Sequence, residues 1–425
     1  MDIHNNNNSP NNPRNSKKTL DLDNIRAIKV LGKGAMGTVF LAYDRVSDPS
    51  AASPFALKVM EKSVLCLKHD ADRRARWEMT VLSSFDNNHT FLPSLLGWFE
   101  AEELMGWAMP YCSGGDLNAL RYGMSDRVFS TSAIRFYLAE IVCALAHVHS
   151  MGIAYRDLKP ENILVQSSGH VTLTDFDLSR KLIRRKKGSG NAGSDPDVIR
   201  EFVKHHPPAP PFSASRRNHL SRIFAYGSGQ DTGLKKANSA RVSPVNRRRM
   251  SFAGGKRSNS FVGTEEYVSP EVVRGEGHEF GVDWWALGVL AYEMLYGRTP
   301  FRGNNRKETF RNVLMKEPEF VGQRTELIHL IERLLEKDPV KRLGRYRGAE
   351  EIKEHEFFRG LKWDLLTEVG RPPFVPDVAT VDLTEKATFD VREYFQKLRA
   401  PPSIPSSPVY SCSSEDEANI SLTDF

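Results

Sequence analysis

The stretch that decides the fold reads Tyr-Arg-Asp-Leu-Lys-Pro-Glu-Asn and occupies residues 155–162. Before it, apolar residues recur every three or four positions over residues 130–150, which predicts a buried helix. After it, residues 163–165 and the alternating run at 171–174 flank a serine-glycine turn, which predicts a short hairpin leading to Asp175. A loop held between a buried helix and a hairpin is a rigid platform for polar groups.

The polar groups on this platform suit phosphoryl transfer. Asp157 would orient a hydroxyl, and Lys159 would neutralise the transferred phosphate. Asn162 and Asp175 would supply oxygen ligands to magnesium. The competing interpretation is a polar turn that happens to be rich in charge. The rest of the chain argues against that interpretation, because it supplies the missing parts of such a site in order.

The composition is that of an ordinary soluble protein. The 425 residues are 40% hydrophobic and 26% charged, which allows one large domain or two to three smaller ones. The most apolar run, residues 281–297, contains two acids, so we expect no membrane span, and the amino terminus lacks the apolar core of a secretory signal. The four cysteines are isolated from one another, which favours reduced thiols in the cytosol or nucleus.

The formal charge of +6 conceals an asymmetry. Residues 181–259 contain 18 Lys or Arg against four Asp or Glu, a balance of +14, so the remainder of the chain carries −8. The basic character therefore belongs to one segment.

Two strands joined by a glycine-rich turn are predicted near the amino terminus. Residues 25–30 and 38–43 have strand patterns, and Gly32, Gly34 and Gly37 lie between them. Glycine lets the backbone approach phosphates with its N–H groups facing the anion. Dinucleotide-binding folds also use G-x-G-x-x-G, but they require a helix afterwards, whereas this chain continues as a strand.

Lys58 lies in an apolar strand at residues 55–60, where an unpaired ammonium is costly. Its expected partner is Glu78, in a helical segment at residues 70–85. The glutamate would fix the rotamer of the lysine, which would contact the α- and β-phosphates of a nucleotide. The alternatives are a solvent-reaching edge-strand lysine and an ordinary surface glutamate. Residues 94–100 and 106–111 predict a second hairpin, followed by a glycine hinge with Asp116 as the N-cap of a helix.

These motifs, in this order, resemble the signature set of the eukaryotic protein kinases. The matching motifs are G-x-G-x-x-G-x-V at 32–39, Ala-Leu-Lys at 56–58, Tyr-Arg-Asp at 155–157 and Asp-Phe at 175–176. The resemblance implies an α+β, bilobal fold with a small β-rich N-lobe at 23–110 and a mainly helical C-lobe at 111–358. Composition predicts a disordered tail at 1–22 and a disordered basic insertion at about 182–258, and the resemblance implies a carboxy-terminal tail at 359–425.

Further motifs resemble the AGC group of serine/threonine kinases, among them Asp-Trp-Trp-Ala-Leu-Gly at 283–288 and Arg-Leu-Gly at 342–344. Asp177, where glycine usually follows Asp-Phe, and the long insertion are similar to the plant AGC VIII branch, in particular the UNICORN-type kinases. Because aspartate tolerates the left-handed backbone region, we expect the turn to survive at Asp177. The resemblance implies transfer of the γ-phosphate of ATP, with Mg²⁺, to serine or threonine in protein substrates, autophosphorylation, and a role in plant developmental or growth signalling.

Carried over position by position, the resemblance assigns Asp157 and Lys159 to catalysis and Asn162 and Asp175 to the metal. The residues it assigns to ATP are Leu31, Gly32, Lys33, Gly34, Gly37, Val39, Lys58, Glu78, Pro110 and Cys112. Those it assigns to the substrate are Asp116, Glu161, Glu293 and Thr264, the three acids facing substrate arginines. The alternative for Glu293 is a buried structural acid.

Control of the site is expected from residues outside it. The resemblance implies a phosphosite at Ser260, whose phosphate would pair with Arg156, and a buried ion pair between Glu271 and Arg342. The basic clusters of the insertion suit nuclear import or contact with anionic lipid. Dedicated nucleic-acid binding is least favoured, because no array of aromatic residues accompanies the charges.

The carboxy-terminal tail resembles the extension that wraps the N-lobe of AGC kinases. An upstream phosphoinositide-dependent kinase is a candidate activator, although Leu422 stands where an aromatic residue usually precedes a terminal Phe such as Phe425. We expect a monomer in the cytoplasm and nucleus, with peripheral contact at the plasma membrane. A second hypothesis is a kinase-fold scaffold that presents the basic insertion to membrane or nuclear partners.

Overall fold

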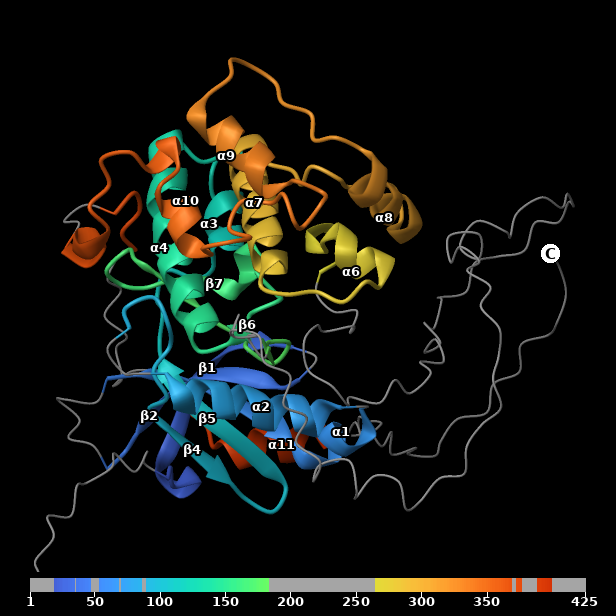
Figure 1. Cartoon of the computed structure of the whole chain (residues 1–425). Coiled ribbons are helices and arrows are strands. Elements are labelled where there is room, and N and C mark those ends of the chain that lie inside the picture. Colours follow the sequence, from blue (N-terminus) through green and yellow to red (C-terminus); the bar gives the residue numbers. More distant parts are fainter. Residues whose placement is uncertain are drawn as a thin grey trace, which may run out of the picture. The chain divides into compact units, whose positions relative to one another are not determined.

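The computed structural model describes residues 19–34, 36–46, 53–68, 70–85, 89–182, 264–368, 372–376 and 388–399 (Figure 1). Ser260, Phe425 and nearly all of the predicted basic insertion lie outside these residues. The described residues form two lobes, one built on a five-stranded sheet and the other mainly helical. The predicted α+β, bilobal fold is therefore confirmed.

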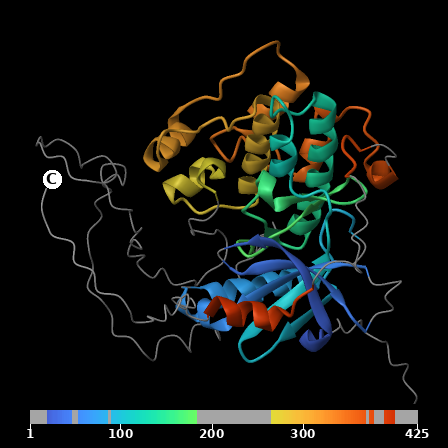
Figure 2. The ribbon, with the colours of Figure 1, turned by 180° about the vertical axis from the view of Figure 1, so that it is seen from behind.

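The N-lobe sheet is antiparallel throughout, with the strand order β1-β2-β3-β5-β4. Its strands are β1 (Ile25–Lys33), β2 (Thr38–Asp44), β3 (Phe55–Glu61), β4 (Gly97–Glu100) and β5 (Leu104–Pro110). Helix α2 (Ala71–Ser84) lies on one side of the sheet in Figure 1, and α11 (Val391–Arg399) lies on the other side in Figure 2. Because both faces are covered, six of the seven residues of β5 are buried.

The amino-terminal edge of this lobe differs from the prediction. Residues 19–22, which we expected to belong to a disordered tail, are part of the packed lobe. Leu20 and Leu22 are buried, and the Leu20 N–H donates to the Trp98 carbonyl at 2.8 Å. The short helix η1 (Leu22–Asn24) then leads into β1.

The C-lobe is organised around two buried helices, α4 (Thr131–Ser150) and α7 (Gly281–Tyr296). Around them lie α3 (Leu117–Tyr122), α6 (Pro270–Arg274), α8 (Arg306–Met315), α9 (Glu326–Leu334) and α10 (Ala349–Lys353). The hairpin of β7 (Ile163–Val165) and β8 (Val171–Leu173) was predicted, whereas the pairing of β6 (Ile153–Ala154) with β9 (Arg180–Lys181) was not. The C-lobe also contains four short 3₁₀ helices, η2 (Pro160–Asn162), η3 (Glu265–Tyr267), η4 (Glu356–Phe358) and η5 (Trp363–Glu368). In the N-lobe, the short helix α1 (Lys62–Leu67) precedes α2.

Helix α4 begins where the sequence predicts, because the Ser130 hydroxyl caps it by accepting from the Ala133 N–H at 3.2 Å. It is the one helix in the described part of the chain with the length and hydropathy of a membrane span. Its predicted apolar positions, including Ile134, Leu138 and Leu145, are fully buried in the C-lobe core. Here the apolar character serves protein packing.

The carboxy-terminal tail contacts the N-lobe in its described part, as the sequence predicts. Phe389 forms a β-bridge with Ala27 of β1, and α11 follows at once. The fully buried ring of Phe40 is surrounded by Phe389, Tyr394 and Phe395, with ring centroids 5.0–6.1 Å away. Edge-to-face contacts of this kind add to the burial of apolar area.

Candidate active site

The carboxylate of Asp283 in α7 anchors the start of the loop at residues 155–162. Asp283 is fully buried and accepts hydrogen bonds from the N–H groups of Tyr155 (2.9 Å) and Arg156 (2.7 Å). Its Oδ2 also lies 2.7 Å from His149 Nε2. Arg156 takes a φ of 73°, a left-handed conformation that is uncommon for arginine. The anchor allows this sharp bend and turns the next residue, Asp157, towards the site.

Asp157, Lys159 and Asn162 form one hydrogen-bonded cluster on that loop. Asp157 Oδ2 accepts from Lys159 Nζ at 2.9 Å and from Asn162 Nδ2 at 2.8 Å. Asn162 Nδ2 also donates to the Asp157 carbonyl at 2.8 Å. Burial raises the pKa of Asp157, and Lys159 opposes that shift. The cluster therefore holds a carboxylate beside an ammonium, with the amide oxygen of Asn162 left available to a metal.

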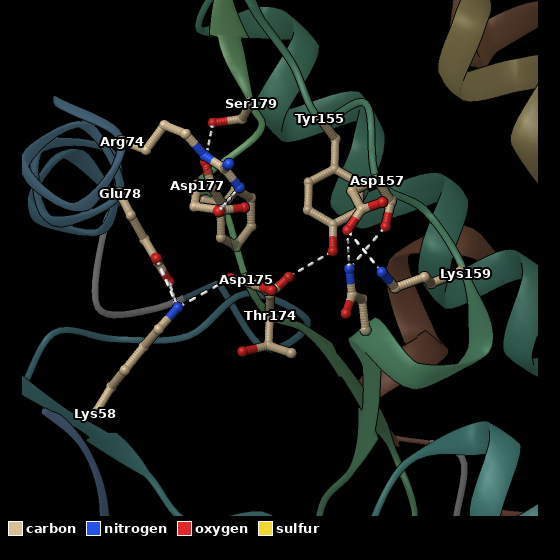
Figure 3. Close-up of polar contacts among 12 residues, drawn as sticks. Lys58, Arg74, Glu78, Tyr155, Asp157, Lys159, Thr174, Asp175, Asp177 and Ser179 are labelled. Atoms are coloured by element: carbon tan, nitrogen blue, oxygen red, sulfur yellow. Dashed lines mark hydrogen bonds and ion pairs between the residues drawn. The ribbon is translucent and has the colours of Figure 1, made fainter. Parts of the chain in front are cut away.

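The second half of the site reaches it from the N-lobe (Figure 3). Lys58 Nζ lies 2.7 Å and 2.9 Å from the two oxygens of Glu78, so the ion pair predicted from the sequence is present. The same ammonium lies 2.9 Å from Asp175 Oδ1. Burial acts to lower the pKa of Lys58, but the two carboxylates outweigh it and raise the pKa well above its usual value. Lys58 thus joins α2 of the N-lobe to Asp175 of the C-lobe.

The glycine-rich turn joins β1 to β2, and its glycines differ in what they do. Gly32 has open space where a side chain would begin, whereas a Cβ at Gly34 would make an ordinary contact with the Gly37 carbonyl oxygen at 3.8 Å. At Gly37 an added Cβ would lie 2.3 Å from the Val59 carbonyl oxygen, so glycine is required there for packing on β3. The Gly34 N–H donates to the Gly37 carbonyl at 2.8 Å, which closes the turn.

The other residues predicted to bind nucleotide lie on the strands around this turn. Leu31 is 37% exposed on β1, and Val39 of β2 pairs with Lys58 of β3. Pro110 is the exposed last residue of β5, two positions before the half-buried Cys112. Burial raises the pKa of the Cys112 thiol to about 11, so this residue is a neutral thiol.

Lys33 follows Gly32 on β1, and its ammonium lies 5.3 Å from the ring centre of Tyr394 in α11. This cation–π distance links the glycine-rich turn to the carboxy-terminal tail.

The three acids predicted to face a substrate have different surroundings. Asp116 caps α3 by accepting from the Ala119 N–H at 2.8 Å, and Glu161 is exposed. Glu293 is buried, forms an ion pair with Arg121 at 2.9 Å and accepts from the Tyr267 hydroxyl. The structure thus places Glu293 in the buried setting that the sequence left open as its alternative. Thr264, the fourth predicted substrate residue, is exposed and lines a small cavity together with Asp157.

The expectation for Asp177 was wrong in its backbone part. Among the described residues the left-handed non-glycine positions are Asp70, Arg127, Arg156 and Asp175, and Asp175 has a φ of 58°. The unusual backbone of this turn is therefore taken two residues earlier than expected. The side chain of Asp177 is buried and forms an ion pair with Arg74 of α2 (Figure 3).

The roles of Asp283 and Arg74 were not predicted from the sequence. A signal existed for each: Asp283 is one of two acids in a largely apolar helix, and Arg74 lies four positions before Glu78, on the same helical face. The predicted pair of Glu271 and Arg342 is present and bidentate, with distances of 2.7 Å and 2.9 Å.

Comparison with known proteins agrees with this geometry. The family model described as "Protein kinase domain" matches residues 25–206 and 249–358. The chain therefore belongs to the protein kinase family.

Relatives place the chain more narrowly. It is 57% identical over 417 residues to the serine/threonine-protein kinase UCNL of Arabidopsis thaliana, which covers 96% of this chain and 98% of that protein. It is 57% identical over 390 residues to UCN, covering 90% and 92%, and 43% identical over 366 residues to OXI1, covering 84% and 80%, both from the same plant. The chain is a serine/threonine protein kinase of the plant AGC VIII branch, as its motifs predicted. None of these matches supports the scaffold alternative.

Proposed function

We propose that the chain transfers the γ-phosphate of ATP, with Mg²⁺, to serine or threonine hydroxyls that lie in basic sequence contexts of proteins. The observation that carries the proposal is the meeting of two clusters. Asp157, Lys159 and Asn162 share hydrogen bonds on one loop, while Lys58 brings Glu78 and Asp175 together opposite them. Phosphoryl transfer needs little beyond such positioning and charge stabilisation.

The donor set fits magnesium. The Asn162 amide nitrogen is engaged by Asp157, so its oxygen is the atom left for a cation, and the Asp175 side chain is 38% exposed. An amide oxygen and a carboxylate are ligands of the hard type that Mg²⁺ takes. When bound, Mg²⁺ would bridge phosphate oxygens and neutralise their charge.

The nucleotide is assigned to Lys58, the glycine-rich turn and the end of β5. Lys58, oriented by Glu78, supplies a fixed positive charge for the α- and β-phosphates. Gly32 leaves the backbone of the turn accessible to an anion, and the hydrogen bond from the Gly34 N–H to the Gly37 carbonyl fixes the shape of the turn. Pro110 has no N–H but keeps the carbonyl that an adenine amine needs, and Cys112 supplies a further backbone group.

The hydroxyl of the substrate is assigned to Asp157. Its raised pKa makes it a somewhat better proton acceptor than an exposed aspartate, and its hydrogen bonds fix its orientation. Lys159, 2.9 Å away, neutralises charge on the transferred group. Thr264 lies close enough to line the same cavity and is assigned to substrate positioning.

The preference for a basic context rests on two carboxylates, those of the exposed Glu161 and the half-buried Asp116. Asp116 and Glu161 are the accessible acids among those predicted, and arginine pairs well with carboxylates through two parallel hydrogen bonds. Glu293, engaged by Arg121 and Tyr267, supports the platform from inside and meets a substrate arginine only by sharing its carboxylate.

Regulation and location extend the proposal. Ser260 is the proposed phosphosite, modified by autophosphorylation or by an upstream phosphoinositide-dependent kinase, and Arg156 is its proposed partner. The basic segment at residues 181–259 is proposed to contact anionic lipid, so that a monomeric, cytoplasmic and nuclear protein also associates with the plasma membrane. Plant developmental or growth signalling is the proposed setting.

The proposal is tested with the variant Asp157→Asn and the matched control Asp364→Asn, an exposed residue of η5. Both proteins receive ATP, Mg²⁺ and a peptide library in which arginines precede a serine. We expect Asp157→Asn to lose at least about a hundredfold of kcat, within the range by which a positioned acid–base group accelerates proton transfer. The control should stay within twofold of the parent. Undiminished transfer by Asp157→Asn would refute the assignment.

A further inference from the structure

Asp177 presents a problem that its backbone does not explain. It stands where glycine usually follows Asp-Phe, yet it is not among the left-handed residues of the chain. Its side chain is 3% exposed, and Asp175, a second carboxylate, lies two residues before it. Placing two carboxylates this close in a buried site is unfavourable unless cations compensate for them.

The compensating cation is Arg74 of α2. Its guanidinium forms an ion pair with Asp177 Oδ2, joining the N-lobe helix to the segment that begins at Asp175 (Figure 3). Arg74 lies four residues before Glu78, so both side chains leave the same face of α2. One face of one helix therefore contacts Asp177 directly and Asp175 through Lys58.

A third contact continues this face. Trp77 Nε1 donates to Ser179 Oγ at 3.0 Å, and Ser179 Oγ donates to the Phe176 carbonyl at 2.6 Å. Phe176 is fully buried, with its ring 5.0 Å from that of Tyr155 and 4.9 Å from that of Phe85. Residues 74, 77 and 78 of α2 thus all connect to the segment 175–179.

We propose that Asp177 is a positioning residue, which acts through Arg74 to hold α2 and Asp175 in the arrangement that Lys58 and Glu78 require. This proposal rests on the roles proposed above for those three residues. Movement of α2 away from the C-lobe would break the ion pair of Arg74 with Asp177 and leave the neighbouring carboxylates of Asp175 and Asp177 without that cation. The ion pair therefore penalises the separated arrangement and favours the assembled one.

The proposal makes an unusual prediction about glycine. Asp177→Gly installs the residue found at this place in most kinases, yet here it should lower activity, because Arg74 would lose its partner and the turn its attachment to α2. If the contact served folding alone, its loss would lower the stability of the protein but leave the activity of each folded molecule unchanged.

The test is a double-mutant cycle on kcat and on the KM for ATP·Mg²⁺, using Asp177→Asn, Arg74→Met and the double variant. Asp177→Gly and Arg74→Lys are measured beside them, with Arg76→Met as the matched control. Arg76 is on the same helix but pairs outwards with Asp72 and Glu100. Thermal unfolding of each variant reports the fraction that is folded.

We expect each single variant to lose about tenfold of kcat/KM, since small misplacement of a catalytic group is costly. The kcat/KM of the double variant should be no lower than that of the less active single variant, because the same contact is removed in all three proteins. Arg74→Lys should recover part of the activity, and Arg76→Met should stay within twofold of the parent.

Two results would overturn the proposal: Asp177→Asn and Asp177→Gly with kcat/KM within twofold of the parent, or single effects that multiply in the double variant. The parent and Asp157→Asn are run in the same assay. A parent whose transfer survives Asp157→Asn contradicts the proposed function itself, and that outcome is distinct from failure of the Arg74–Asp177 pair.

Discussion

Arg342 is almost fully buried, and all three nitrogens of its guanidinium donate hydrogen bonds. It forms the bidentate pair with Glu271, donates from Nη1 to the Gly281 carbonyl at 2.9 Å and from Nε to the Glu336 carbonyl at 3.0 Å. Its guanidinium also lies 5.2 Å from the ring centre of Trp285. Three parts of the C-lobe, namely α6, α7 and the segment after α9, therefore meet at one side chain.

Replacing this arginine should be severe. Arg342→Met would leave the Glu271 carboxylate buried without a cation, and breaking such a pair from one side costs about 3–5 kcal/mol. The matched control is Arg345→Met, three positions along, where an exposed pair with Glu279 should contribute less than about 1 kcal/mol. The measurement is urea unfolding of both variants at 25 °C. Equal midpoints for the two variants would contradict this account of Arg342.

At the scale of single residues, the sequence predicted partners well when a motif carried them. Lys58 with Glu78 and Glu271 with Arg342 were both named from the sequence, and both pairs are present. Asp283 was missed as an anchor because its partners are backbone N–H groups 127 and 128 positions away. Nearly every residue has a backbone N–H, so the residue types do not show which ones will donate to Asp283. Only its apolar neighbours in the sequence marked Asp283 as unusual.

At the scale of elements, the least expected is α11. Its nine residues are too few to be stable alone in water, so its stability must come from packing. The packing partner is the outer face of β1 and β2, where Val391 and Phe395 are buried against Phe40. Arg399, at its end, lies 2.6 Å from Glu61 and 2.7 Å from Glu103.

Removing one aromatic ring from this contact tests it. Phe395→Ala should destabilise the protein by about 3 kcal/mol, because Phe395 is 4% exposed and its removal leaves a cavity beside Phe40. Leu398→Ala, on the same helix but 57% exposed, should stay within about 0.5 kcal/mol of the parent. Thermal unfolding, followed by tryptophan fluorescence, measures both. An unchanged midpoint for Phe395→Ala would show that α11 does not stabilise the sheet.

The elements that the sequence predicted are those with long or alternating patterns. The helices over residues 70–85 and 130–150 and the strands of the N-lobe sheet all appear within a few residues of their expected positions. The second hairpin differs from its prediction in the lengths of its strand and turn. Its first strand, β4, begins at Gly97 instead of residue 94, and the turn spans residues 101–103 instead of 101–105. Helix α11 was not predicted, because its short amphipathic pattern acquires meaning only beside strands that lie more than 340 positions earlier.

At the scale of the whole molecule, the charge asymmetry is the feature with the widest consequence. Residues 184–255 hold 15 basic and four acidic residues, a net charge of +11. A lysine or arginine near an anionic membrane contributes about 1 kcal/mol, and salt weakens that attraction. The lipid contact proposed for this segment therefore requires no residue of the catalytic cluster.

Replacing residues 184–255 tests whether lipid binding and catalysis depend on different parts of the chain. With residues 184–255 replaced by a short glycine-serine linker, we expect transfer to the arginine-containing peptide to stay within about threefold of the parent. Sedimentation with phosphatidylserine vesicles at 0.1 M salt should be lost. A variant with the same residues in scrambled order should still sediment, because charge alone is invoked. Equal sedimentation of the linker variant and the parent would contradict a lipid-binding role for this segment.

The docking of α11 also has a consequence for how the protein is made. The match to the kinase family ends at residue 358, yet Phe40 is buried by residues 389–395. During synthesis the ribosome produces the N-lobe first, but some 290 residues must follow residue 110 before α11 is complete and can cover the face of the sheet that carries Phe40. At about 5–20 residues per second that interval lasts roughly 15–60 s. Throughout it an aromatic surface stays open to chaperones, and a message truncated before codon 389 would yield a chain that never closes it.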